Sequence, residues 1–124
     1  MEIEDIKFNT FIIGVQKAGT SYLKDILSQH PEIETHQANE FMSFLDPVYK
    51  DEAALQKSIK QGFNKDQLSS KKHILGKSVG VFVSQVALKR LFSHNKNVKL
   101  IVVLRNPIDR VFSAYNYCLS RGLE

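Results

Sequence analysis

The segment Phe11-Ile12-Ile13-Gly14-Val15-Gln16-Lys17-Ala18-Gly19-Thr20-Ser21 has the pattern of a strand, a glycine-containing turn and the start of a helix. Its first three residues form a short apolar run that ends at Gly14, which is typical of a buried parallel strand. After the glycine-containing turn, apolar residues recur at helical spacing, and Pro31 cannot continue the helical hydrogen-bond ladder. We therefore predict a strand, a turn and a helix from Thr20 to about Gln29. The apolar residues assigned to that helix are Tyr22, Leu23, Ile26 and Leu27.

A second unit of the same kind lies near the end of the chain. The run Lys99–Leu104 is apolar and rich in β-branched residues, as expected of a strand. Asn106 is a suitable N-cap, and Pro107 suits the first helical position, where its missing N–H has no cost. The helix that follows has one apolar stripe, which predicts a buried face. The stripe consists of Ile108, Val111, Phe112, Tyr115 and Leu119.

The middle of the chain completes an alternating pattern. Asp51 and Glu52 precede apolar residues at helical spacing, as favoured at the positive end of a helix. A short strand is expected within Lys71–Gly76, and Glu32–Lys50 is interpreted as a loop that can contain short elements. Another helix is outlined by Val83, Val86, Ala87 and Leu91. The order β, α, loop, α, β, α, β, α predicts an α/β fold, a three-layer parallel sheet flanked by helices.

Length and composition limit the possible classes of protein. The chain has 124 residues and a mass of 14.1 kDa, with 43% hydrophobic and 24% charged residues, which suits one globular domain. The net charge of +4 is small and no basic stripe with interleaved aromatics is visible, so no nucleic-acid partner is expected. Cys118 has no second cysteine with which to form a disulfide or the usual zinc site. Because Met1–Lys7 lacks the features of a secretory signal and no apolar run can span a bilayer, we expect a cytoplasmic protein without a membrane span.

The first turn has the composition of an anion-binding loop. Gly14 and Gly19 are separated by four residues, as in nucleotide-binding phosphate loops, but Lys17 lies inside the loop and Thr20 follows the second glycine. Backbone N–H groups, the Thr20 and Ser21 hydroxyls and the Lys17 ammonium can together hold a tetrahedral anion. The alternative is an ordinary turn in which Thr20 caps the helix and Lys17 is solvated.

Two motifs taken together resemble the sulfotransferases that use 3′-phosphoadenosine 5′-phosphosulfate (PAPS). The first is Gln16–Ser21 and the second is Arg105–Tyr115, and their style is similar to the carbohydrate (heparan-type) and bacterial members. The resemblance implies the sulfotransferase version of the phosphate-loop fold and metal-free sulfuryl transfer, with Lys17 stabilising the leaving phosphate. It also implies that the first motif binds the 5′-phosphosulfate and the second the 3′-phosphate. The implied cofactor-binding residues are Lys17, Ala18, Gly19, Thr20, Ser21, Arg105 and Ser113.

The resemblance also suggests the groups that act on the acceptor. Glu40, in the acidic and aromatic segment Asn39–Phe44, occupies the position of the general base in the carbohydrate-type enzymes. Other members use histidine, which leaves His36 and His73 as alternatives. Lys77, in a segment similar to the family's Glu-Lys-Ser-Pro, is expected to contact the sulfuryl group or an acidic acceptor. The alternative for Lys77 is a surface lysine at the end of an edge strand.

Some features depart from the family. Gln16 and Ala18 replace the usual proline and hydroxyl residue, and Gly76 and Val79 replace the acid and proline around Lys77. Family domains usually continue for about as long again, so we expect residues 1–124 to be one PAPS-binding domain without the usual C-terminal part. The acceptor is expected to be a small molecule or a carbohydrate. Two alternatives stay open: a truncated nucleotide-binding domain without catalysis, and a phosphate-loop kinase-like protein.

Overall fold

A computed structural model describes residues 6–64 and 73–120 of the chain. They contain one four-stranded sheet in the order β2-β3-β1-β4, and every neighbouring pair is parallel. The strands are β1 (Thr10–Gly14), β2 (Ile33–Thr35), β3 (His73–Lys77) and β4 (Lys99–Val102). The helices are α1 (Thr20–Ser28), α2 (Glu52–Gly62), α4 (Gln85–His94) and α5 (Pro107–Ser120), with 3₁₀ turns η1 (Ser43–Leu45) and η2 (Val79–Val83).

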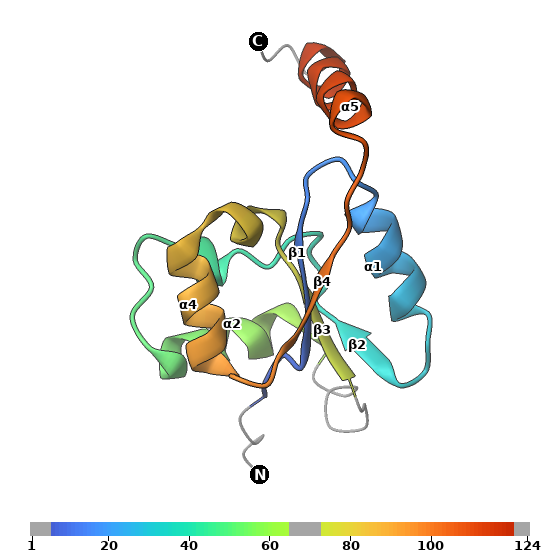
Figure 1. Cartoon of the computed structure of the whole chain (residues 1–124). Coiled ribbons are helices and arrows are strands. Elements are labelled where there is room, and N and C mark those ends of the chain that lie inside the picture. Colours follow the sequence, from blue (N-terminus) through green and yellow to red (C-terminus); the bar gives the residue numbers. More distant parts are fainter. Residues whose placement is uncertain (1–5, 65–72, 121–124) are drawn as a thin grey trace.

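The sheet is covered by helices on both faces. Helix α1 lies on one face and α2 and α4 lie on the other, as Figure 1 shows. Since the strands are parallel, their carboxyl ends all lie at the same end of the sheet. Helix α5 projects from that end (Figure 1). The predicted three-layer α/β fold is therefore confirmed.

The core is built around aromatic side chains. Phe8 and Phe11 pack edge to face with ring centroids 5.2 Å apart, and Phe41 lies 4.9 Å from Phe8. This geometry suits the ring quadrupoles. The aromatic cluster contacts buried residues of α2 and α4, so the main core lies between β1 and these helices. The cluster consists of Phe8, Phe11, Phe41, Phe44 and Phe63.

Three helix starts follow local capping rules. The Asp51 carboxylate accepts a hydrogen bond from Ala54 N at 2.9 Å, and the Ser84 hydroxyl accepts one from Ala87 N at 3.1 Å. The Asn106 side chain accepts a hydrogen bond from Ile108 N at 2.9 Å, which confirms the predicted cap.

The middle of the chain differs from the sequence prediction at one helix. The short elements allowed for in the predicted loop Glu32–Lys50 are β2 and η1. Strand β2 has three residues of mixed character, too few to show a period. The helix outlined by Val83, Val86, Ala87 and Leu91 does not include Val83, because residues 79–83 form η2 and α4 begins only at Gln85. Val83 and Val86 are 83% and 57% exposed. The expected strand within Lys71–Gly76 corresponds to β3, although Lys71 lies outside the described residues.

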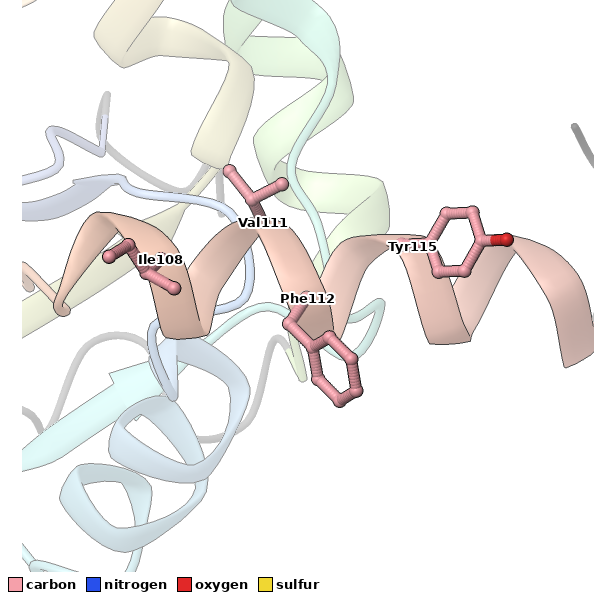
Figure 2. A pocket seen from close by; sticks show the side chains of 4 residues that line it. All are labelled: Ile108, Val111, Phe112 and Tyr115. Carbon is pink, nitrogen blue, oxygen red and sulfur yellow. The ribbon is translucent and has the colours of Figure 1, made fainter.

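The apolar stripe of α5 is also not buried. Ile108 is 80% exposed, Val111 59% and Phe112 67%, and Figure 2 shows these side chains with Tyr115 along the helix. In residues 6–64 and 73–120 no other element covers this face. Strand β4, from which α5 follows, is an edge strand with Leu100 and Val102 partly exposed. A periodic stripe indicates which face of a helix is apolar, whereas burial needs a partner surface.

Candidate functional site

The turn between β1 and α1 contains two residues with left-handed backbone angles. Lys17 has φ of 61° and Gly19 has φ of 86°, so both lie in the left-handed region. A Cβ on Gly19 would meet nothing within 4 Å, so glycine is favoured there by the backbone angle rather than by space. Gly19 is the N-cap of α1 and no side-chain cap bond is made, which leaves Thr20 without the capping role of the ordinary-turn alternative. Such turns direct backbone N–H groups into a concave surface at the positive end of a helix.

The end of β4 holds this turn in place. Val15 N donates to Val103 O at 3.0 Å, and Val103 N donates to Gly14 O at 2.9 Å. Beyond the strand, Arg105 Nη1 donates a hydrogen bond to Lys17 O at 2.9 Å. The two motifs singled out in the sequence are therefore in direct contact, although they lie at opposite ends of the chain.

Lys77 is buried at the carboxyl end of β3. Its N–H donates to His36 Nε2 at 3.0 Å, and its carbonyl oxygen accepts from Phe41 N at 2.8 Å. The side chain is 1% exposed, and Nζ donates to Ser21 Oγ at 3.1 Å. The alternative of a solvated surface lysine does not describe this residue.

Glu40 completes a charged group around Lys77. The ring of Phe41 is buried in the aromatic cluster and its backbone is bonded to Lys77, so the preceding residue is held against the end of β3. Glu40 Oε2 lies 3.3 Å from Lys77 Nζ, and the glutamate side chain is 26% exposed. The carboxylate thus has one face on a buried cation and another open to a ligand.

Two cavities meet at this group. The first, here called the phosphate-loop cavity, has a volume of about 520 Å³ and the second, the apolar cavity, about 660 Å³. Both are lined by Gln16, Glu40 and Val79, which form the wall between them. The glutamate carboxylate therefore borders both spaces.

The phosphate-loop cavity collects most of the residues selected from the sequence. It is lined by Lys17, Gly19, Thr20, Ser21, Glu40 and Lys77. Arg105 lines the apolar cavity instead, and Ser113, half-buried on α5, lines neither of these two spaces in the described part of the chain. Ala18 belongs to the turn without lining the cavity. Lys17 Nζ lies 3.2 Å from the centroid of the Tyr117 ring, so α5 reaches the phosphate-loop cavity through a cation–π contact.

The two candidate histidines occupy different environments. His36 is 2% exposed, Nε2 accepts from Lys77 N, and Nδ1 donates to Ala38 O at 2.6 Å. Burial chiefly lowers the pKa of His36 to about 4, and the charges of Lys24 and Lys77 act in the same direction. Both of its nitrogens are engaged, so His36 supports Lys77. His73 is exposed at the opposite end of β3, roughly 13 Å along the strand from Lys77.

Lys24 is a member of this group that sequence analysis missed. It is 5% exposed on α1, whereas Tyr22 and Ile26, two of the apolar residues from which the helix was predicted, are 72% and 44% exposed. Burial lowers the pKa of Lys24, and the charge of Lys77 lowers it further, while Asp25 and Glu40 oppose this shift. Its spacing from Thr20, four residues earlier and also buried, was the available signal, because both then lie on one helix face.

A glycine-containing turn at the carboxyl ends of parallel strands, beside a buried lysine and a carboxylate, defines an α/β protein with a phosphate-loop-like cavity. The family model described as "Sulfotransferase domain" matches residues 7–122. This chain belongs to the sulfotransferase family, as its motifs predicted.

Individual relatives agree with this assignment. Mouse (Mus musculus) heparan sulfate glucosamine 3-O-sulfotransferase 3B1 is 33% identical over 110 residues, which are 89% of this chain and 26% of the relative. Membrane-associated sulfotransferase kil1 of Dictyostelium discoideum is 30% identical over 112 residues, 90% of this chain and 23% of that protein. The crystal structure of a sulfotransferase from Alicyclobacillus acidocaldarius matches with a TM-score of 0.80 and 28% identity, covering 96% of this chain and 53% of that one. The chain thus spans about a quarter of these curated relatives and about half of the solved structure.

One further property concerns membranes. Among the described helices, none has the length and apolar character needed to cross a bilayer.

Proposed function

We propose that this chain binds PAPS and transfers its sulfuryl group to a hydroxyl or amine of an acceptor. The observation that carries the proposal is the phosphate-loop cavity, where Lys17, Glu40 and Lys77 come together from three separate segments. Family membership supports the sulfuryl chemistry, since the relatives described above are named as sulfotransferases. The proposal treats residues 1–124 as the cofactor-binding part of the family's domain.

In this proposal the β1–α1 turn binds the 5′-phosphosulfate. The backbone N–H groups of Ala18, Gly19 and Thr20 and the Ser21 hydroxyl donate to its oxygens. Lys17 then leaves the Tyr117 ring for the bridging oxygen, where negative charge develops as the bond breaks. Arg105 and Ser113 are proposed to bind the 3′-phosphate, as the second motif implies. For Ser113 this requires a ligand that extends beyond the phosphate-loop cavity towards α5.

The transfer itself needs a base and a cation at the sulfur. The acceptor oxygen or nitrogen attacks sulfur, the bond from sulfur to the 5′-phosphate oxygen breaks, and adenosine 3′,5′-bisphosphate leaves. Glu40 takes the acceptor proton, since its carboxylate borders both cavities. Lys77, whose Nζ lies 3.3 Å from Glu40 Oε2, stabilises the charge on the sulfuryl oxygens.

The acceptor class is proposed from the name of a relative. The mouse relative is named for heparan sulfate glucosamine, which suggests an acceptor with hydroxyl groups, either a carbohydrate or a small molecule. A cytoplasmic location stays a prediction from the sequence.

Ligand-dependent melting tests donor binding. Adenosine 3′,5′-bisphosphate should raise the melting temperature more than ATP with Mg²⁺, because a ligand that binds only the native state stabilises it. Lys17→Ala should remove most of that gain, whereas Lys57→Ala, an exposed lysine on α2, should not. A preference for ATP with Mg²⁺ would reject the assignment in favour of a kinase-like protein.

Catalysis is tested separately with radiolabelled PAPS and a panel of alcohols, phenols, amines and saccharides. Transfer to any acceptor that disappears in Lys17→Ala supports the proposal. Binding of the bisphosphate without transfer to any member of the panel would favour the non-catalytic nucleotide-binding domain.

A further inference from the structure

The apolar cavity lies on the acceptor side of the proposed base. Glu40 lines it together with the phosphate-loop cavity, so a molecule in the apolar cavity has a group within reach of the carboxylate. Its volume of about 660 Å³ falls in the range of small-molecule sites, roughly 300–1,000 Å³.

The walls of this cavity are apolar and unusually exposed. Phe82 is 43% exposed, Met42 56%, and Val83 83%, and Leu45 and Leu104 complete the surface. Large apolar side chains that gather at a concave site indicate binding of an apolar body. Phe82 packs against the end of β1. A Cβ added to Gly14 would lie 2.7 Å from Phe82 Cβ.

The charges at this cavity are few. Among its lining residues, Arg105 is the one cation and Glu40 the one anion, and Arg105 already donates to Lys17 O. A sulfated saccharide carries several negative charges and is usually held by several arginines or lysines. The apolar cavity therefore does not match a polyanion.

One buried polar atom points to a ligand with a single polar end. Ser78 is 1% exposed, lines the apolar cavity, and its Oγ has no hydrogen-bond partner in the described residues. Its backbone is fixed by a bond from Ser78 N to Ile12 O at 3.0 Å. A buried hydroxyl without a partner is costly, and a turn of the Ser78 side chain towards the cavity would let a bound acceptor oxygen satisfy it.

We infer that the apolar cavity is the acceptor site and that it takes a phenol or alkyl alcohol with an uncharged apolar body. The acceptor hydroxyl lies at the wall formed by Glu40 and bonds to Ser78 Oγ, while its body packs on Phe82, Met42 and Val83. The role of Glu40 in this inference rests on the proposed function. The preference of the apolar cavity for an uncharged apolar ligand does not.

Fluorescence titration with 2-naphthol tests the site without requiring turnover. The chain contains no tryptophan, so naphthol emission can be excited beyond the tyrosine band with little protein background. Phe82→Ala keeps the Cβ that packs on β1 and removes the ring, and should weaken naphthol binding at least about tenfold. Phe92→Ala is the matched control, because Phe92 on α4 is 44% exposed and lies outside the cavity. It should leave the affinity within about twofold.

Two further variants guard against a folding defect. Val83→Glu introduces a charge at a site that is 83% exposed, so it should fold and still weaken naphthol binding. Ser78→Ala should weaken naphthol more than naphthalene, which lacks the hydroxyl.

The inference is overturned if naphthol binding is equal in wild type, Phe82→Ala and Val83→Glu. It is also overturned if a heparin-derived hexasaccharide binds more tightly than naphthol and displaces it. Should adenosine 3′,5′-bisphosphate fail to bind while naphthol binding depends on Phe82, the proposed donor is wrong and the apolar ligand site stands.

Discussion

The Nζ atom of Lys77 lies 3.3 Å from Oε2 of Glu40, although one residue ends a strand and the other belongs to a loop nearly forty positions earlier. The pairing follows from two backbone contacts of Lys77, with His36 on one side and Phe41 on the other. Because Phe41 is anchored in the aromatic cluster, the carboxylate and the ammonium are brought together by the core itself.

This pairing predicts strong coupling between the two residues. Lys77→Met leaves the Glu40 carboxylate beside an apolar group and should lower the free energy of unfolding by about 1–3 kcal/mol. Glu40→Gln should cost less, since its side chain is 26% exposed. In the double variant the loss should be smaller than the sum of the single losses by about 1 kcal/mol, measured by urea unfolding. Strict additivity would show that the pair contributes no stability.

Gly76 lies too close to the aromatic core to carry a side chain. A Cβ at this position would collide with the Phe11 ring and lie 2.9 Å from Phe8 Cδ1. Gly76→Ala should therefore destabilise the chain by about 1–3 kcal/mol through overpacking. Gly76→Glu should prevent folding.

Gly19→Ala is the comparison for this experiment. A Cβ there has open space, so its cost should come from the φ of 86° alone and amount to about 1–2 kcal/mol. The additional variant Phe11→Leu should rescue Gly76→Ala in part and leave Gly19→Ala unchanged, as judged by melting temperature. Equal behaviour of the two glycines would contradict the packing explanation.

The buried His36 should make stability depend on acid. Its pKa falls from 6.5 to about 4 on folding, so below pH 6.5 the unfolded chain binds a proton that the folded chain does not. Stability is unaffected above that pH and is lost as pH falls towards 4, by about 3 kcal/mol in total. Urea midpoints between pH 7.5 and 4.5 should fall more steeply in wild type than in His36→Gln. Burial also lowers the pKa of His94, so both proteins should keep part of the dependence of stability on pH.

Substitutions in the exposed apolar stripe of α5 should have little effect on stability. Phe112→Ser and Val111→Ser change side chains that are 67% and 59% exposed, so each should alter the free energy of unfolding of the 124-residue chain by no more than about 0.5 kcal/mol. Leu91→Ser, at a fully buried site on α4, is the contrasting variant and should cost several kcal/mol. A large effect at Phe112 would show that the stripe is covered in solution.

Local chemistry determined much of the fold. An apolar strand followed by a glycine turn and a helix can be recognised from neighbouring residues, and so can the caps at Asp51 and Asn106. The parallel sheet follows from the alternation of such units. The spacing of Gly14, Lys17 and Gly19 likewise indicated the turn between β1 and α1, and the left-handed φ of Gly19 agrees with the choice of glycine there.

Contacts between distant segments decided the rest. Periodicity marked apolar faces on α1 and α5, but Lys24 rather than Ile26 is buried on α1, and the α5 stripe lies open. Whether an apolar helix face is buried depends on which other element packs against it, and this is decided only in the folded chain. The meeting of Lys77 with Glu40, and the two cavities that share its carboxylate, arise from a core contact between β3 and residues 36–41 that no local pattern encodes.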